Sequence, residues 1–262
     1  TSVEKREYEK VLEHVKKQAE MSKQIKENID LLTWSETAVN GYEYKFMDDT
    51  TLSDLAVEKQ TVFLVGYKDW LIKPDRPANS VHFYNSEGEL MDKYFKNKLV
   101  PIYEYVPYRK QLRKLFLDKK IEKYLQKYLH LVYIRLTKPS FIPYDTDNVI
   151  NTEVGKIGVR ICYEGNFPSM FKKQTEQGAR TLVLLSSDAM FGENSSIPYI
   201  DFNTNIVRAV ENGRYLIRND NYGMSGIISP YGKVIKKTRL AEETVLVGNY
   251  KTIVQKTFYT KY

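Results

Sequence analysis

Residues 156–186 read KIGVRICYEGNFPSMFKKQTEQGARTLVLLS, and this stretch decides the fold. Its segments 156–162 and 181–186 predict strands, and the second has the continuous apolar character of a strand in a sheet buried on both faces. Between them, Pro168 suits the first turn of a helix, and Gly178 is typical of the position after a helix ends. A strand, a helix and a second buried strand in succession indicate an α/β protein.

The same alternation extends in both directions along the chain. Residues 85–88 predict a hairpin turn. No internal repeat or low-complexity linker interrupts the pattern, so we expect one domain over residues 1–262. The other expected helices cover 3–29, 52–59 and 200–212, and the other expected strands cover 30–34, 61–67, 80–84, 90–94, 215–218, 225–229, 233–237 and 245–249.

Composition excludes several classes of protein. The 262 residues are 42% hydrophobic, which is enough for a buried core and excludes disorder as the main state. The single cysteine excludes an intramolecular disulfide framework and a multi-cysteine zinc or iron–sulfur site. His14, His82 and His130 stand in unrelated contexts, so we expect neither a metal nor another cofactor. We expect no signal peptide and no membrane-spanning segment, because no apolar run is long enough.

Most of the net charge of +7 belongs to one stretch of the chain. Residues 109–127 contain eight basic and two acidic residues, so the net charge of this stretch is +6. Apolar residues at near-helical spacing, Phe116 among them, predict a basic amphipathic helix that suits a membrane surface. The alternative is an ordinary solvated helix, while nucleic acid is not an expected partner, because no nucleic-acid-binding motif accompanies the charge. The basic residues are Arg109, Lys110, Arg113, Lys114, Lys119, Lys120, Lys123 and Lys127.

Cys162 is the candidate nucleophile, because it ends the strand 156–162 at the edge where α/β sheets place ligand sites. The alternative is an inert buried thiol. A reactive thiol needs a base or a nearby cation, and no histidine has a suitable context. Glu36 and Lys96 each follow an expected strand closely. Singly each would be a surface charge, but together with Cys162 they form a Glu–Lys–Cys site hypothesis.

The motifs around these residues resemble those of the nitrilase, or carbon–nitrogen hydrolase, superfamily. Within it they are most similar to the catalytic domain of bacterial apolipoprotein N-acyltransferases, which the run at 99–107 distinguishes from soluble amidases. The resemblance covers nearly the whole chain in the family's order. The matching segments are WSETA (34–38), YFKNKLVPIYEYVP (94–107), ICYE (161–164), SDAMFG (187–192) and RAVENGR (208–214).

The resemblance implies a four-layer α-β-β-α sandwich. The family's first strand, expected before the helix 3–29, and its membrane-spanning helices are not found in this chain. Ser35, Lys98 and Met190 replace the family's proline, histidine and tryptophan, and residues 102–103 also depart from its pattern. None of these changes removes a catalytic group.

The resemblance also implies roles for individual residues. Glu36 is the expected base, Lys96 the expected stabiliser of the oxyanion, and Cys162 the residue that carries the acyl group. Glu104 and Glu164 would orient Lys96 and the thiol environment, and Tyr163 would shape the acyl pocket. The alternatives are that both glutamates are hydrogen-bonded structural carboxylates and that Tyr163 simply packs.

The implied reaction moves an acyl chain from a phospholipid to the N-terminal amine of a lipoprotein. It would take place at the outer, periplasmic side of the bacterial inner membrane. Residues 108–138 correspond to an arm that would face the bilayer. The alternatives are a cytoplasmic amidase or nitrilase with the same three residues, and an inactive lipid-binding scaffold.

Overall fold

The computed structural model describes residues 2–40, 50–70, 76–115, 119–129, 133, 136–137, 140–192 and 194–262. The helices are α1 (Ser2–Lys23), α3 (Thr51–Lys59), α4 (Arg109–Leu115), α5 (Lys119–Tyr128), α7 (Pro168–Glu176), α8 (Ile197–Asn212) and α9 (Phe258–Lys261). The strands are β1 (Leu31–Asn40), β2 (Val62–Asp69), β3 (Ala78–Tyr84), β4 (Leu90–Phe95), β5 (Ile150–Thr152), β6 (Gly155–Ile161), β7 (Thr181–Ser186), β8 (Leu216–Asp220), β9 (Gly226–Ile228) and β10 (Val234–Lys237).

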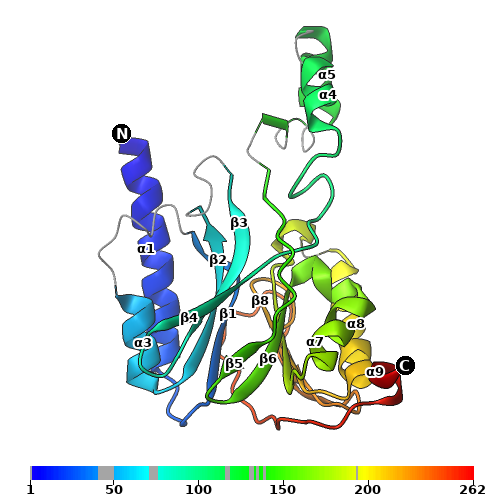
Figure 1. Ribbon diagram of the computed structural model, residues 1–262. Helices are drawn as coiled ribbons and strands as arrows, with labels where there is room; N and C mark the ends of the chain where they lie inside the picture. Colours follow the sequence, from blue (N-terminus) through cyan, green and yellow to red (C-terminus); the bar gives the residue numbers. More distant parts are fainter. Residues whose placement is uncertain are drawn as a thin grey trace.

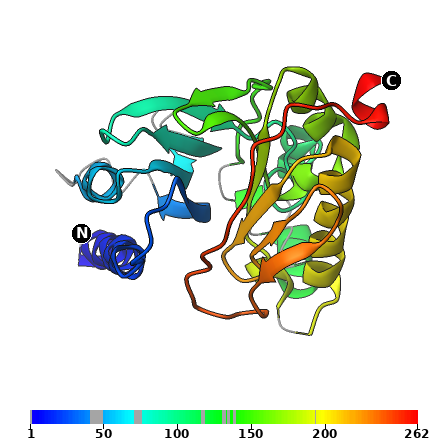
Figure 2. The ribbon, with the colours of Figure 1, turned by 90° about the horizontal axis from the view of Figure 1, so that it is seen from below.

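These strands form two sheets that face each other, with helices on both outer sides (Figures 1 and 2). The first sheet has the order β1-β2-β3-β4, and the second has the order β10-β9-β8-β7-β6-β5. Helices α1 and α3 cover the first sheet, and α7 and α8 cover the second. The expected α-β-β-α sandwich is therefore confirmed.

The central strands are continuously apolar because their side chains point alternately to two faces that are both covered. In β2, Phe63 and Val65 pack under α1 and α3, whereas Leu64 packs against the second sheet. In β7, Leu184 faces the outer helices and Leu185 faces the first sheet. Because successive side chains point to opposite faces, a strand covered on both sides needs apolar residues at every position.

Several predicted elements differ from the structure. The helix expected over 3–29 ends at Lys23, and β5 was not expected. Of the predicted basic helix, the structure describes α4 and α5, and residues 116–118 between them lie outside the described residues. The prediction of a strand over 245–249 is wrong, because this segment has no regular secondary structure. Its apolar pattern is strand-like, but no described strand pairs with it.

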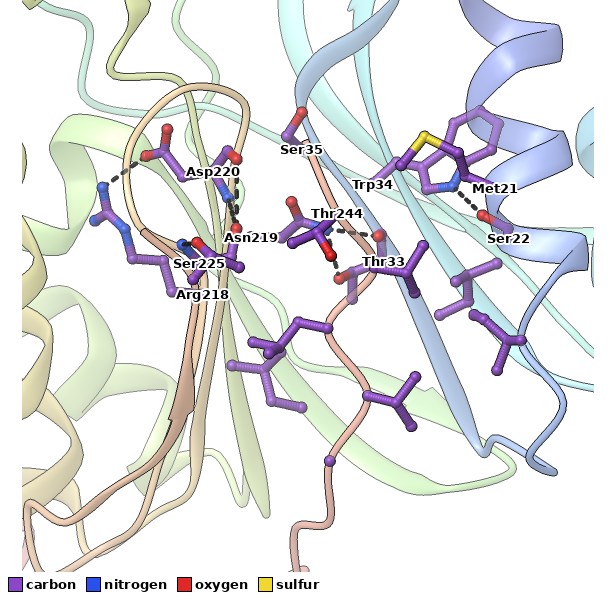
Figure 3. A pocket seen from close by; sticks show the side chains of 18 of the residues that line it. Met21, Ser22, Thr33, Trp34, Ser35, Arg218, Asn219, Asp220, Ser225 and Thr244 are labelled. Carbon is purple, nitrogen blue, oxygen red and sulfur yellow. Dashed lines mark hydrogen bonds and ion pairs between the residues drawn. The ribbon is translucent and has the colours of Figure 1, made fainter. Parts of the chain in front are cut away.

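Segment 245–249 lines a cavity of about 520 Å³ (Figure 3). It is lined by residues of β1 on one side and by residues 241–250 on another, and β1 is the edge strand of its sheet. The Asn219 side chain of β8 crosses to β1, where its amide donates to the Thr33 carbonyl at 2.6 Å. Among the described strands, the first sheet therefore ends at β1.

Within the described ranges, no helix combines the length and apolar character that crossing a bilayer requires.

Candidate active site

Glu36 lies at an irregularity in β1 that a glycine of the neighbouring strand permits. The pairing of β1 with β2 shifts its register between Trp34 and Val39, so Glu36 lies inside the strand rather than after it. Opposite stands Gly66, where a Cβ atom would lie 2.0 Å from the Ser35 carbonyl oxygen and 2.8 Å from the Glu36 Cα. Only glycine allows this approach, which brings the Glu36 carboxylate into the buried space between the sheets.

Lys96 follows β4 and lies between two carboxylates. Its Nζ donates to Glu36 Oε1 at 2.9 Å and to Glu104 Oε1 at 3.0 Å. The Asn79 side-chain amide donates to the same two oxygens at 2.6 and 3.2 Å. Burial acts to lower the pKa of Lys96, but the two carboxylates outweigh it and raise that pKa well above its usual value. The ammonium group therefore stays charged.

Glu104 and Glu36 differ in their other interactions. Glu104 Oε2 accepts a hydrogen bond from the Val100 backbone N–H at 2.8 Å, which fixes it to its own loop. Burial raises the pKa of Glu36, and the charge of Glu104 adds to this effect, while Lys96 opposes it. A carboxylate with a raised pKa holds a proton more readily, as a general base must.

Cys162 begins a short 3₁₀ helix, η1 (Cys162–Asn166), directly after β6. Its φ of 50° lies in the left-handed region, which is uncommon for a residue with a side chain and recurs at functional sites. Glu164 holds this turn, because its carboxylate accepts from the Ile161 N–H at 2.9 Å. The same carboxylate accepts from Asn97 N–H at 2.6 Å and Lys98 N–H at 3.0 Å. Glu164 therefore ties the cysteine's turn to the segment that carries Lys96.

The thiol of Cys162 is neutral in the resting site. Burial raises its pKa well above the ordinary value, and the negative charge of Glu36 raises it further. Lys96 and a hydrogen bond with Ser186 act in the opposite direction without compensating. Attack by the sulfur therefore requires a base that removes its proton as the new bond forms.

The three predicted residues meet at one cavity of about 220 Å³. Glu36 and Lys96 line it with Cys162, and both of their charges act on the thiol. Tyr163 lies outside the described lining, and its ring packs edge-on against Phe167. The other described lining residues are Thr37, Lys68, Asn79, Val100, Tyr103, Glu104, Phe141, Ser187 and Met190.

The predicted lipid-facing residues other than Phe116 lie on α4 and α5, and these helices project away from the sandwich (Figure 1). Arg109 donates to Ser140 Oγ at 2.7 Å and to the Leu136 carbonyl at 2.9 Å, so its guanidinium closes the base of this arm. Phe116 lies outside the described residues, and Lys119 and Lys120 belong to α5. Lys110, Arg113, Lys114, Lys123 and Lys127 are exposed.

Sequence reasoning missed three residues that shape the site. Asn79, Gly66 and Ser186 act through neighbours on other strands, and nothing adjacent to them in the sequence reveals those neighbours. The available signal was a polar residue or a glycine within, or at one end of, an otherwise apolar stretch.

Comparisons with known proteins show which family this chain is similar to. The carbon-nitrogen hydrolase family model matches residues 5–253. The apolipoprotein N-acyltransferase of Geobacter metallireducens is 31% identical over 239 residues, which cover 89% of this chain and 42% of that protein. The Pseudomonas paraeruginosa protein of the same name is 26% identical over 247 residues, covering 90% of this chain and 43% of that protein. The chain thus spans less than half the length of these relatives.

Solved structures show the same fold. A carbon-nitrogen hydrolase from Helicobacter pylori G27 has a TM-score of 0.67 at 19% identity, covering 90% of this chain and 82% of that one. A variant amidase from Nesterenkonia sp. AN1, which carries an acrylamide adduct on its active-site cysteine, has a TM-score of 0.62 at 15% identity, covering 88% of this chain and 84% of that one. The family match spans most of the residues, so the resemblance seen in the sequence is confirmed, and the chain belongs to the carbon-nitrogen hydrolase family.

Proposed function

We propose that this chain is the catalytic domain of an acyltransferase that moves a fatty acyl chain from a phospholipid to the N-terminal amine of a lipoprotein. The observation that carries the proposal is the placement of Cys162 in the same cavity as the Lys96 ammonium and its two carboxylates. The names of the matched relatives supply the reaction class. A membrane surface and a site at the outer face of the bacterial inner membrane belong to the same proposal.

In the first half-reaction, the Cys162 sulfur attacks the ester carbonyl carbon of the phospholipid while Glu36 accepts the thiol proton. Lys96 stabilises the negative charge that develops on the carbonyl oxygen. The carbon–oxygen ester bond then breaks, and the departing lysophospholipid alcohol takes the proton from Glu36. A thioester on Cys162 remains.

In the second half-reaction, the amine of the acceptor attacks the thioester carbonyl carbon. Glu36 accepts a proton from the attacking nitrogen, and Lys96 again stabilises the oxyanion. The carbon–sulfur bond breaks, the sulfur recovers a proton from Glu36, and an amide is released. One base thus serves both steps, which fits a carboxylate whose pKa is raised by burial.

A hydrolase is the second candidate, because an amidase of the same fold is among the structural neighbours. In that case water would attack the thioester, and the first product would be ammonia or an amine. The same three residues would act. An inactive scaffold is a third reading, and it requires that Cys162 form no adduct.

Intact-mass spectrometry after incubation with phosphatidylethanolamine in detergent micelles tests the proposal. We expect a stable gain of one acyl group that is absent in Cys162→Ala and that disappears when an amine-bearing lipopeptide is added. An amide substrate that releases ammonia while phospholipid leaves no adduct would instead identify a hydrolase. No adduct from any substrate would identify a scaffold.

We also propose that α4 and α5 rest on the membrane. Their exposed cations flank Tyr124 and Tyr128, which are 57% and 59% exposed and pack together at 4.9 Å between ring centroids. Each basic residue near an anionic surface contributes roughly 1 kcal/mol of binding. Exposed aromatic rings add the apolar contact that an interfacial helix needs.

Vesicle flotation measures this contribution. Replacing Lys110, Arg113, Lys114, Lys123 and Lys127 with glutamine is expected to abolish co-flotation with phosphatidylglycerol vesicles, since about 5 kcal/mol is lost. The matched control replaces exposed lysines away from the arm, namely Lys10, Lys16, Lys26, Lys156 and Lys251, and should still float. Equal flotation of both variants and the unmodified chain would refute a membrane role for the arm.

A further inference from the structure

Tyr94 and Arg160 make a contact between the two sheets close to the candidate site. Tyr94 belongs to β4 of the first sheet, and Arg160 belongs to β6 of the second. Two residues after Tyr94 the chain reaches Lys96, and two residues after Arg160 it reaches the candidate nucleophile. Arg160 Nη1 donates to the Tyr94 hydroxyl at 2.9 Å, and its guanidinium carbon lies 5.6 Å from the centroid of the Tyr94 ring. This contact therefore joins the strand that leads to the lysine to the strand that leads to the thiol.

Both side chains are enclosed by the protein, and other groups hold Arg160 in place. Tyr94 and Arg160 are each 0% exposed. Asp147 Oδ1 accepts from Arg160 Nη1 at 2.8 Å, and the Met170 carbonyl accepts from Nη2. A buried charge needs an opposite charge and hydrogen bonds, and these two groups supply them. Burial raises the pKa of Tyr94 well above its ordinary value, so its hydroxyl keeps a proton to donate.

The Tyr94 hydroxyl connects this fixed guanidinium to Glu164. It donates to Glu164 Oε2 at 2.8 Å while it accepts from Arg160. The other described donors to this carboxylate are the backbone N–H groups of Ile161, Asn97 and Lys98. A carboxylate has about four acceptor positions, so the hydroxyl fills the one that the backbone leaves open. Among these donors Tyr94 alone acts through a side chain, so its hydrogen bond can be removed by a substitution.

We propose that Tyr94 is a positioning residue, which sets the relative position of the Lys96 ammonium and the Cys162 sulfur by fixing Glu164. This inference rests on the proposed function, because it takes over the roles proposed there for the lysine and the cysteine. Glu164 joins the turn of the cysteine to the segment that carries Lys96. A carboxylate that could shift would let these two segments move relative to each other. A misplacement of about 1 Å can slow a reaction about 100-fold, and the Tyr94 hydroxyl opposes such a shift.

Removing a single oxygen atom tests the inference. In Tyr94→Phe we expect the rate of Cys162 acylation at saturating phosphatidylethanolamine to fall about 10- to 100-fold, the effect of one hydrogen bond to a charged group. The donor concentration that gives half of the maximal rate should stay unchanged, since Tyr94 lies outside the described lining of the cavity. Thr175→Val is the matched control, because it removes another buried hydroxyl, which is bonded to the Phe171 carbonyl on α7. This control should keep the wild-type rate.

Rates are compared per folded molecule, with the folded fraction of each variant taken from circular dichroism and urea unfolding. A wild-type rate in Tyr94→Phe, or an equal loss in Thr175→Val, would overturn the positioning role. Arg160→Lys tests the same contact from the second sheet. A lysine keeps the charge but cannot bond to Tyr94, Asp147 and the Met170 carbonyl together, so the maximal rate should fall again. If Tyr94→Phe does not fold, an unchanged rate in Arg160→Lys refutes the inference.

A wild-type chain that forms no adduct from any lipid would contradict the proposed function instead. Acrylamide then decides the role of Tyr94, because a variant amidase of the same fold carries an acrylamide adduct on its active-site cysteine. In this addition the sulfur bonds to the terminal alkene carbon, negative charge develops on the amide oxygen, and the thiol proton ends on the neighbouring carbon. A cation held near that oxygen speeds the reaction. Slower addition in Tyr94→Phe than in the wild-type chain and Thr175→Val supports the positioning role, and equal addition refutes it.

Discussion

Replacing Lys96 with methionine is expected to lower the free energy of unfolding by about 3–5 kcal/mol, because it leaves Glu36 and Glu104 buried without their shared cation. The same change should slow adduct formation on Cys162 by about 10²- to 10³-fold, the effect of losing one oxyanion stabiliser. Urea unfolding gives the first quantity, and intact-mass kinetics with phospholipid give the second. Lys96 is 1% exposed, so water cannot take its place cheaply.

A double variant separates the two effects. Lys96→Met combined with Glu104→Gln removes one of the uncompensated charges, so part of the lost stability should return. The acylation rate should not recover, because the cation that we propose as the oxyanion stabiliser is still missing. A Lys96→Met chain that unfolds at the wild-type urea concentration would show that the buried ion pairs are not coupled as the distances indicate.

Replacing Glu36 with glutamine is expected to slow acylation by about 10²- to 10⁴-fold, the usual contribution of a general base. Glutamine keeps the shape of the side chain but cannot accept the thiol proton. In the wild-type chain the base must be ionised, so the rate should fall as the pH drops through the pKa of Glu36. Burial raises that pKa, and the acid limb should therefore lie above the range of an ordinary glutamate.

Single-turnover acylation measured across the pH range tests this assignment. In Glu36→Gln the acid limb should disappear, and the residual rate should rise steadily with pH, because it then depends on spontaneous ionisation of a thiol whose pKa is raised. Glu153→Gln, an exposed carboxylate outside the cavity, should keep the wild-type profile. An acid limb that survives in Glu36→Gln would assign the base to another group.

The layered fold could be predicted because its information is local. A strand covered on both faces has to be apolar at every position, and 181–186 shows this directly. The candidate residues could be proposed for a related reason, since Lys96 and Cys162 follow strands. Glu36 differs, because β1 continues to Asn40 and only the register shift beside Gly66 brings its side chain inward.

The contacts that the sequence could not reveal join residues that are far apart along the chain. Glu164 follows the candidate nucleophile Cys162 by two residues, yet two of its bonds go to the backbone at Asn97 and Lys98. Asn79 reaches carboxylates on two other segments. The strand predicted over 245–249 failed for the same reason, because a strand exists only when a neighbour completes its hydrogen bonds.

Among the described strands, none pairs with β1 on the side that borders the larger cavity, and this has a consequence for handling this polypeptide. An uncovered sheet margin is a template on which another extended peptide can dock through its main chain, and natural proteins usually block such margins with charge or proline. Here the margin borders a hollow of about 520 Å³ with a second extended stretch of chain at its rim. Concentrated preparations should therefore associate by taking up a foreign strand at this place, and their homogeneity will depend on whether that margin is covered.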